Sequence, residues 1–487
     1  MYKAFAVFLI LAISIFAVEL RLDCSERRVA HADEGEQALC YIKLYQTNSY
    51  KYSPEGAHGG ILYYWAYFIK KTESLFRSPN HEISSLRKTL LPIFLLSILA
   101  FFALKSQVNF ACISIAIAGW SVSALSILYS LYFVQEIFFC LFVFLAMSYL
   151  YLAITRQKLG DFIALGLACG LAQSSKETFV IVLFALLIPS IILAYKSKLK
   201  LNYSLAKKAG ISFALALLVY ITLYSSFGTN PKGIVDGIAS YLHFFEKSQS
   251  EIHSKEFLYY TKILFFQKSQ GVYFGEFAIT IFALLGALIG YIKREKIINY
   301  ISSFCVIYFS ILSLISYKTP WLLLSLIMPM CVLFGYAFSV GILHKNKAIK
   351  CLSFIALALT LYAKTSSSIL ATQRFAMDPR NPFIYVHTVG DLKNFLSRIE
   401  QIKTQNPEAS ISFDMKNSPF PIPYYLIKYK NISYNDIAKL KNAQVIVTDN
   451  PELKDNFDSE NYQEEFYGLR ENLIIYLYIE KILLRKL

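Results

Sequence analysis

Long apolar segments recur along the first three quarters of this 487-residue chain and constrain its fold more than any other feature. A helix needs about 20 apolar residues to cross the hydrocarbon core of a bilayer. Hydrophobic residues make up 56% of the chain and charged residues 17%, which excludes an ordinary soluble protein. The sequence predicts a polytopic α-helical membrane protein with about eleven transmembrane helices. We expect them at roughly residues 4–20, 90–104, 108–131, 133–154, 161–174, 178–195, 209–227, 273–292, 297–316, 320–343 and 349–370.

Basic residues gather in four of the connections between these segments. The positive-inside rule assigns such connections to the cytoplasm. No small-x-small cleavage site follows the first segment, so we expect an uncleaved helix with a cytoplasmic N-terminus. The protein is then expected in the plasma (inner) membrane, with the loop 21–89 and the chain after residue 370 on the external, or periplasmic, side. The net charge of +15 follows from this topology and from contact with anionic lipid, so no nucleic-acid partner is expected. The basic connections are 155–161, 195–208, 293–296 and 344–350.

The composition changes near residue 370, where the apolar segments end. A polar linker, 374–382, is followed by a pattern of one helix and several buried strands, which is typical of an α/β domain. We therefore expect a transmembrane domain over 1–370 and a small external α/β domain over 371–487. The second domain carries no Gly-rich phosphate loop and no nucleophile motif, which favours a recognition or structural role. Its expected elements are a helix at 389–404 and strands at 411–413, 443–448 and 472–479.

An acidic stretch opens the external loop 21–89, just beyond the first apolar segment. Asp33, Glu34 and Glu36 lie within four positions of one another, and Arg27 precedes them. A carboxylate at a membrane surface can take a proton from an acceptor hydroxyl if its geometry and pKa suit. The alternative is an acidic start to an interfacial helix, stabilised by the helix dipole. Two interfacial helices are expected in this loop, at 36–44 and 61–69, and the second is rich in Tyr and Trp.

Polar residues also interrupt the apolar segments at their external ends. They are Gln135 and Glu136, Lys176 and Glu177, and Lys318. Ionisable groups at such depth are costly and point to function. The alternative is a local ion pair between Lys176 and Glu177 at a turn, with Lys318 extending its amine to the interface. Their position on the same side as Asp33 favours the functional interpretation.

Taken in order, these motifs resemble the membrane glycosyltransferases of the GT-C type, which include protein O-mannosyltransferases and the enzyme that adds aminoarabinose to lipid A. The resemblance is closest to the flippase-activity-associated family within that superfamily. The matching motifs are His-Ala-Asp-Glu at 31–34, His-Gly-Gly-Ile-Leu-Tyr-Tyr at 58–64, Tyr-Phe-Val-Gln-Glu at 132–136, Ser-Lys-Glu-Thr at 175–178, Lys-Thr-Pro-Trp at 318–321, and further matches at 381–388, 421–426 and 467–470.

The resemblance implies a GT-C-like transferase that moves a sugar from a polyprenyl-phosphate-linked donor to an acceptor hydroxyl on the external face. Asp33 would be the general base, with Glu34 or Glu36 assisting, and the displacement would invert the anomeric centre. Cations at the ends of spans would bind the donor phosphate and stabilise its developing charge. The cations and the polar groups assigned to substrate binding are Arg27, His58, Gln135, Glu136, Lys176, Glu177 and Lys318.

Two departures from the related pattern stand out. The segment 58–60 lacks the prolines of the mannosyltransferase pattern, so the second interfacial helix starts differently. Tyr317 stands before Lys318 where a Glu-Lys pair is expected, so no acidic partner is assigned to Lys318.

Several alternatives stay open. Glu136 together with Asp33 could hold a divalent cation, Mg²⁺ or Mn²⁺, but such a site wants more oxygen ligands than the sequence supplies, and no metal ligand is assigned. The acceptor can be a protein, a lipid or a glycan. The second candidate function is a lipid-linked oligosaccharide flippase, which the one-sided charged motifs and the lack of an internal repeat argue against. The third is a non-catalytic membrane scaffold.

Overall fold

The computed structural model describes residues 2–54, 58–248, 254–265, 267–440, 442–457 and 459–484. Contacts between Cα atoms divide the chain into two units. The first unit holds residues 1–25, 40–375 and 380–383, and the second holds 26–39, 376–379 and 384–487. The structure thus differs from the expected boundary at residue 370 in two respects: residues 26–39 of the first external loop group with the C-terminal region, and residues 371–375 and 380–383 group with the first unit.

Apolar helices make up most of the first unit. Among the described residues, seven helices are long and apolar enough to cross a membrane, or eight if one bent pair counts as a span. The seven are 83–104 (α4, Ile83–Lys88; α5, Leu91–Ala100; η1, Phe101–Leu104), α8 (Glu136–Arg156), α10 (Phe179–Lys196), α11 (Tyr203–Tyr224), α15 (Lys296–Leu314), 320–342 (η3, Pro320–Leu323; α16, Leu324–Ile342) and 347–374 (α17, Lys347–Ile369; η4, Leu370–Arg374).

Each predicted segment falls on a helix of the structure. The bent pair is α6 (Phe110–Val122) and α7 (Ala124–Ser130), and α9 (Leu159–Gln173) and α14 (Phe277–Ile292) are shorter apolar helices. The first predicted segment lies in α1 (Tyr2–Arg27). The polytopic helical fold is therefore confirmed, whereas the count of eleven crossings is not.

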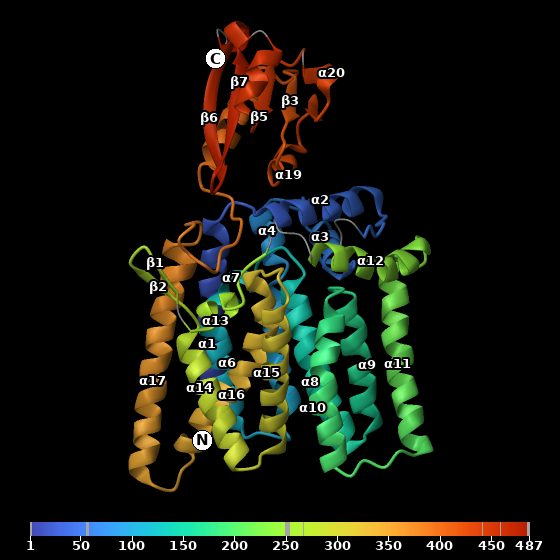
Figure 1. The fold of residues 1–487 in the computed structure, drawn as a ribbon, viewed down its shortest axis with the longest axis vertical. Helices are drawn as coiled ribbons and strands as arrows, with labels where there is room; N and C mark the ends of the chain where they lie inside the picture. The colour runs from blue at the N-terminus through green and yellow to red at the C-terminus, as the bar shows by residue number, and fades with distance from the viewer. Residues whose placement is uncertain are drawn as a thin grey trace. The chain divides into compact units, whose positions relative to one another are not determined.

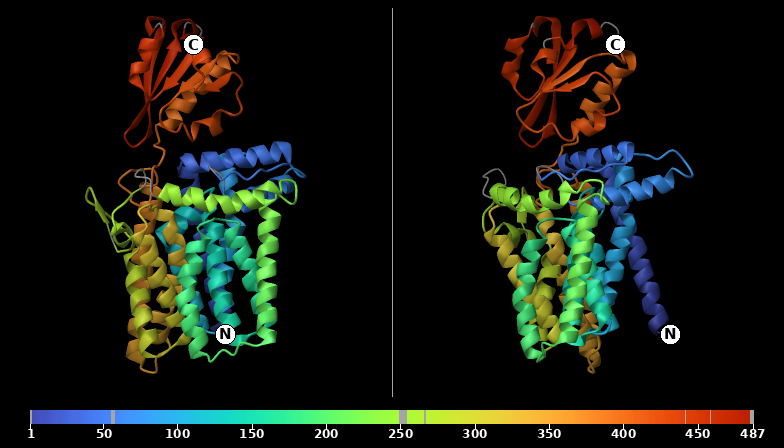
Figure 2. Two further views of the ribbon diagram at one scale, coloured as in Figure 1. Left: turned by 45° about the vertical axis from the view of Figure 1, so that its right-hand side comes forward. Right: turned by 90° about the vertical axis from the view of Figure 1, so that its right-hand side faces the viewer.

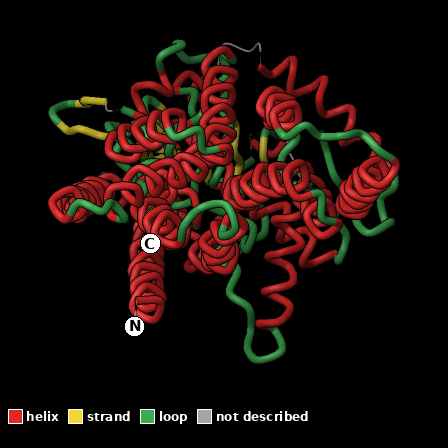
Figure 3. Tube along the Cα trace, turned by 90° about the horizontal axis from the view of Figure 1, so that it is seen from below, coloured by secondary structure: helices red, strands yellow, loops and turns green. Residues whose placement is uncertain are grey.

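The helices of this unit run alongside one another, with the N-terminus at one end (Figures 1 and 2). Seen from below, most of them are viewed close to end-on (Figure 3). The basic connections, α8 to α9, α10 to α11, α14 to α15 and α16 to α17, lie at the N-terminal end (Figure 1). The opposite end carries the connections that hold Glu136, Lys176 and Lys318. The polar motifs expected on one side of the membrane therefore lie at one end of the bundle.

Short elements that lie across the bundle cover this second end (Figure 1). Both helices expected in the loop 21–89 are present and longer than predicted, as α2 (Ala32–Thr47) and α3 (Ile61–Glu73), and their interfacial position stays a prediction. The chain from 228 to 274, which follows the predicted segment 209–227, contains α12 (Lys232–Ser248), α13 (Tyr259–Leu264) and a hairpin of β1 (Gln267–Ser269) and β2 (Val272–Phe274).

The expected segment 108–131 is not one continuous helix. α6 and α7 meet at Ser123 with a bend of 68°. Ser123 has an extended backbone, and its hydroxyl accepts a hydrogen bond from the Ser126 N–H, so it starts α7 as an N-cap. A continuous apolar pattern across both halves hides this break from the sequence.

Charged side chains satisfy the backbone groups that the break exposes. The Arg21 guanidinium donates to the carbonyl oxygens of Ser121, at 3.0 Å, and Trp120, at 3.4 Å, at the end of α6. Glu276 Oε1 accepts from the Leu125 N–H at 3.0 Å, at the start of α7. A cation at a helix C-terminus and an anion at an N-terminus both match the helix dipole. The bend is therefore held by two fully buried charges from α1 and from the start of α14.

The second unit is built on a five-stranded mixed sheet of order β4-β3-β5-β7-β6. Phe395 and Ile399 of α18 (Leu392–Gln405) join Ile411, Val445 and Leu477 of the sheet in one apolar core. The small α/β fold expected after residue 370 is confirmed, but β4 and β6 are strands that the sequence did not predict. The strands are β3 (Ile411–Asp414), β4 (Ile432–Tyr434), β5 (Val445–Thr448), β6 (Tyr462–Arg470) and β7 (Leu473–Glu480), with short helices α19 (Ile422–Leu426), α20 (Ile437–Leu440), η5 (Pro451–Asn456), η6 (Ser459–Asn461) and α21 (Lys481–Leu484).

The Glu276 carboxylate is balanced by Lys364 of α17, whose amine lies 2.9 Å from Glu276 Oε2. Removing one partner of a buried pair leaves an uncompensated charge, which costs about 3–5 kcal/mol. We expect Lys364→Met to lower the free energy of unfolding by about this amount, and the double variant Glu276→Gln/Lys364→Met to recover most of it. Unfolding of the purified protein in detergent measures both. Lys262→Met, at the exposed pair with Glu256, should cost at most about 1 kcal/mol. A double variant as unstable as the single one would contradict the role of the pair.

Candidate active site

Glu136 and Lys176 form a buried ion pair at the polar end of the first unit. Lys176 Nζ donates to Glu136 Oε1 at 2.5 Å, and the two residues are 7% and 4% exposed. Glu136 is the first residue of α8, where a carboxylate is favoured by the helix dipole. Lys176 lies in the turn between α9 and α10. Each charge neutralises the other, so neither is an isolated ion in the bundle.

Glu177 points to different partners from its neighbour Lys176. Its Oε2 lies 2.9 Å from His58 Nδ1, and its Oε1 accepts from the hydroxyls of Tyr52, at 2.8 Å, and Tyr224, at 3.1 Å. Burial alone would raise the pKa of Glu177, but the charge and hydrogen bond of His58 outweigh it and hold the pKa below its ordinary value. The local ion pair between Lys176 and Glu177 is therefore not what the structure shows.

Glycine explains how the His58 segment reaches this turn. A Cβ atom on Gly59 would lie 1.9 Å from the carbonyl oxygen of Ser174, so the two backbones approach too closely for any other residue. His58 keeps a side chain that is 25% exposed, whereas its partner Glu177 is 1% exposed. Glu177 thus holds His58 in place, and His58 presents its ring to the surface.

Gln135 joins the same cluster. Its amide donates to the Tyr63 hydroxyl at 3.3 Å, and Tyr63 lies on α3, directly after the His-Gly-Gly segment. The structure therefore brings together five of the residues predicted for substrate binding: His58, Gln135, Glu136, Lys176 and Glu177.

Lys318 lies in the connection between α15 and α16, at the same end of the unit, and has a different environment. It is 1% exposed, and its amine donates to two main-chain carbonyls, those of Ile315 and, at 3.3 Å, Lys255. In the part of the chain that the structure describes, no carboxylate pairs with it. Burial lowers the pKa of Lys318 below its usual 10.5. A buried cation that meets only carbonyl dipoles is electrostatically prepared for an anion.

In the second unit, the first turn of α2 holds Asp33 and Glu34. Glu34 is fully buried, and its Oε2 accepts from the His31 N–H at 3.1 Å, as in a capping box. His31 Nε2 lies 2.8 Å from the Tyr385 carbonyl and must donate to it, so Nδ1 accepts from the Asp33 N–H at 3.0 Å. The Asp33 side chain is 47% exposed. Glu34 therefore stabilises the helix start, and Asp33 is the accessible carboxylate.

Residues of the C-terminal region contact this turn. A Cβ atom on Gly35 would lie 2.8 Å from Pro421, and the Ala30 N–H donates to the Tyr425 hydroxyl at 2.8 Å. Arg27, the remaining predicted cation, is exposed at the end of α1 and belongs to this unit.

The negative charge of Asp33 also affects the pKa values of Tyr385 and Arg470. Burial, and then the charge of Asp33, raises the pKa of Tyr385 to about 12. Burial lowers the pKa of Arg470, and the charges of Asp33 and Asp449 oppose that shift. Tyr385 and Arg470 lie in the motifs at 381–388 and 467–470, but the sequence did not predict either of them as a site residue.

The residues present do not fit a divalent cation at Glu136. Its carboxylate is already neutralised by Lys176, and a metal ion there would have to displace that amine. Among the described residues there is no group of three or more His, Cys, Asp or Glu side chains that could hold a metal ion. We derive no step through a metal.

Comparison with known proteins identifies the fold. Residues 64–224, about a third of the chain, match the family described as dolichyl-phosphate-mannose-protein mannosyltransferase. ArnT from Cupriavidus metallidurans bound to undecaprenyl phosphate is similar in structure, with a TM-score of 0.67 and 12% identity over 97% of both chains. An oligosaccharyltransferase from Archaeoglobus fulgidus in the apo form gives a TM-score of 0.56 and 13% identity over 96% of this chain and 74% of its own. No curated protein sequence matches the chain significantly.

These similarities confirm the resemblance to the GT-C glycosyltransferase superfamily at the level of the fold. At identities of 11–13%, these matches show only that the folds are similar. The role of each residue is therefore argued from its contacts in this structure.

The Glu177 pair makes stability depend on pH with a defined sign. Because the pKa of Glu177 in the folded chain lies below 4.5, its ionised carboxylate contributes stability that is present above that value and is lost as the pH falls through the lower folded-state pKa. We expect Glu177→Gln to lower the free energy of unfolding by about 1–3 kcal/mol at neutral pH, and by progressively less in acid. Thermal unfolding in detergent across this range measures the effect. Tyr50→Phe removes a hydrogen bond to the His58 main-chain carbonyl, at 2.9 Å, rather than to the carboxylate, and should show no such pH dependence. A Glu177→Gln loss that is constant with pH would contradict the ionic contribution.

Proposed function

We propose that this protein transfers a sugar from a polyprenyl-phosphate-linked donor to an acceptor hydroxyl, with inversion, at the external face of the membrane. The observation that carries the proposal is Lys318, a buried cation whose amine, among the described residues, donates to main-chain carbonyls and pairs with no carboxylate. Burying an unpaired charge is expensive, so a site of this kind is expected to receive an anion. The donor supplies one as its phosphate.

Lys318 is a better phosphate ligand than Lys176. The Lys176 amine is already neutralised by Glu136 at 2.5 Å, so it offers no net charge to a second anion. The undecaprenyl phosphate bound to the structurally similar ArnT supports a polyprenyl phosphate as the lipid portion of the donor. As the bond to the sugar breaks, negative charge grows on that phosphate, and a preorganised cation stabilises it.

The cluster around His58 supplies groups suited to a sugar. The exposed edge of the His58 ring, the Gln135 amide and the Glu136–Lys176 pair offer both donors and acceptors for hydroxyls. Glu177 is enclosed by its own partners, so we assign it the role of holding His58 rather than of touching the substrate.

Asp33 is proposed as the general base. The acceptor oxygen attacks the anomeric carbon as the bond to the phosphate oxygen breaks, the acceptor proton passes to the Asp33 carboxylate, and the electron pair stays on the leaving phosphate. Asp33 suits this role because it is accessible, whereas Glu34 is buried and serves the helix start. Asp33 lies on α2, a continuous helix whose later residues, Cys40 to Thr47, belong to the first unit.

Replacing Asp33 tests the enzymatic claim. We expect Asp33→Asn to lower sugar transfer by about 10²–10⁴-fold, because the amide cannot accept the proton, while donor binding stays unchanged. Transfer from a panel of polyprenyl-phosphate sugars in nanodiscs measures this, and Glu26→Gln, an exposed acid earlier in the same unit, is the matched control. Full transfer by Asp33→Asn would exclude it as the base. Absence of turnover from every bound donor by the unaltered protein would favour a flippase or scaffold.

The pH dependence of donor binding tests Lys318. Because burial lowers the pKa of Lys318 below 10.5, its amine loses the proton earlier than an exposed lysine as the pH rises, so phosphate binding should weaken before that value. Lys318→Arg stays charged and should shift this alkaline loss to higher pH. Lys318→Met should bind about tenfold or more weakly while the lysine of the unaltered protein is protonated, and the two should converge as the pH rises past the pKa of that lysine. Binding of a short-chain polyprenyl phosphate to the purified variants measures each effect, and an unchanged alkaline limb in Lys318→Met would reject Lys318 as the ligand.

A further inference from the structure

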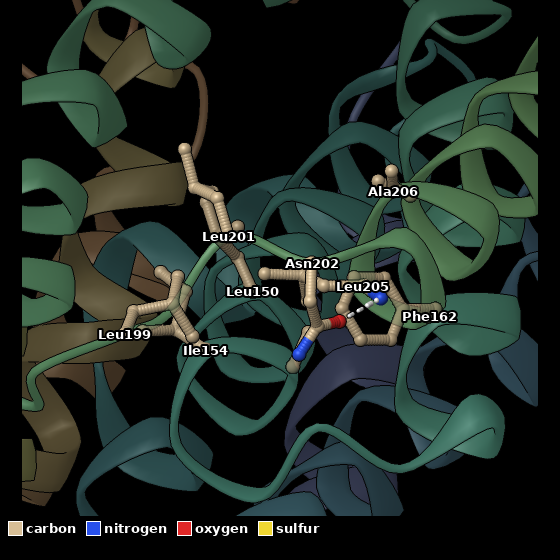
Figure 4. Close-up of a pocket in the computed structure, with 10 residues that line it drawn as sticks. Leu150, Ile154, Phe162, Leu199, Leu201, Asn202, Leu205 and Ala206 are labelled. Carbon is tan, nitrogen blue, oxygen red and sulfur yellow. Dashed lines mark hydrogen bonds between the residues drawn. The ribbon is translucent and has the colours of Figure 1, made fainter.

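A cavity of about 380 Å³ opens at the basic end of the first unit, far along the helices from the polar motifs. It lies where α8 ends, α9 begins and α11 begins, beside the connection from α10 to α11 (Figure 4). Leu150, Phe162 and Leu205 are among its lining residues. Among the lining residues, Asn202 is the one with a polar side chain, and its amide oxygen accepts a hydrogen bond from the Leu205 N–H at 2.9 Å.

Water is a poor occupant for this cavity. A buried water needs two to four polar partners, and an apolar cavity stays dry or takes an apolar guest. The lining therefore favours a hydrocarbon chain.

The rim of the cavity is strongly basic. In the connection from α10 to α11, lysine and leucine alternate, so that Leu199 and Leu201 line the cavity while Lys198 and Lys200 are exposed. Residues 154–210 contain only two acids. One, Asp161, is paired with Arg156 at 3.3 Å, and the other, Glu177, lies at the opposite end of the bundle. Among the described residues, no carboxylate forms an ion pair with Lys198 or Lys200 within 4.0 Å.

The exposed apolar residues of this connection indicate contact with the bilayer. Leu201 is 89% exposed although it lies beside the cavity, and Tyr195 and Tyr203 are each 84% exposed. Tyrosines flanked by lysines are typical of the lipid headgroup level. The cavity therefore faces the part of the bilayer in which phosphate headgroups and the first carbons of acyl chains lie.

We propose that this cavity binds one acyl chain of an anionic glycerophospholipid, whose phosphate pairs with Lys198 and Lys200. Charge complementarity selects an anionic lipid over a zwitterionic one, and the apolar lining selects an intact acyl chain. The bound lipid stabilises α11, which is largely exposed along its length, against α8 and α9. This site is independent of the proposed transfer reaction, because the residues proposed for transfer lie at the other end of the unit or in the second unit.

The test uses the full chain in nanodiscs that contain equal amounts of phosphatidylglycerol and phosphatidylcholine. Native mass spectrometry then measures the phosphatidylglycerol retained after release from the nanodisc. Each lysine near an anionic surface contributes about fivefold in affinity, so Lys198→Gln/Lys200→Gln should retain phosphatidylglycerol at least about tenfold more weakly. Lys345→Gln/Lys347→Gln, which removes the same charge from another basic connection at this end, should retain it like the unaltered protein.

A second variant tests the apolar part of the site. Ala206→Phe fills the cavity without a change in charge and should also reduce retention, while its elution as a single folded species controls for misfolding. Equal loss in both lysine variants would show general attraction of anionic lipid and overturn the site. Unchanged retention in Ala206→Phe would overturn the acyl-chain cavity. Retention of added undecaprenyl phosphate in place of phosphatidylglycerol would assign the cavity to a prenyl chain and overturn the proposal as well.

Discussion

A charge inside an apolar helix bundle must be compensated, and this requirement organises the first unit. Among the described residues of this unit four carboxylates are buried, and each has a cationic or titratable partner: Glu136 with Lys176, Asp161 with Arg156, Glu177 with His58, and Glu276 with Lys364. Asp161 and Arg156 are close in the chain, whereas each of the other three pairs joins segments far apart. Among the described residues Lys318 has no carboxylate partner, and its amine donates to main-chain carbonyls. Arg21 is also buried without a carboxylate partner, but its guanidinium binds the carbonyls and hydroxyls at the bend, so Lys318 is the better candidate for binding an anion.

The same requirement shapes the backbone. The bend at Ser123 exposes carbonyls at the end of α6 and N–H groups at the start of α7, which a bilayer cannot satisfy. Arg21 and Glu276 satisfy them, and α7 then leads directly into the segment that carries Gln135 and Glu136. The buried charges that hold the bend are thus connected by a short length of chain to the candidate site.

The two acids at the start of α2 have different roles because one is buried and the other is accessible. Asp33 and Glu34 are adjacent, and the sequence treats them as a pair. In the folded chain Glu34 is enclosed and bonds the His31 N–H, while Asp33 remains accessible and its charge is felt by Tyr385 and Arg470. The C-terminal region thereby shares a unit with the proposed base, a relationship that hydropathy could not reveal.

The sequence by itself determined the membrane-spanning helical fold, the small α/β fold after residue 370 and the set of polar motifs, because hydropathy and charge are properties of local segments. It also predicted His58, Gln135, Glu136 and Lys176 as members of one site. Only the tertiary structure decided that Lys176 pairs with Glu136 rather than with its neighbour Glu177, that residues 108–131 bend at Ser123, and that residues 26–39 group with the C-terminal region. These outcomes depend on which charges and backbone groups approach one another through space, and that proximity exists only after distant segments have packed.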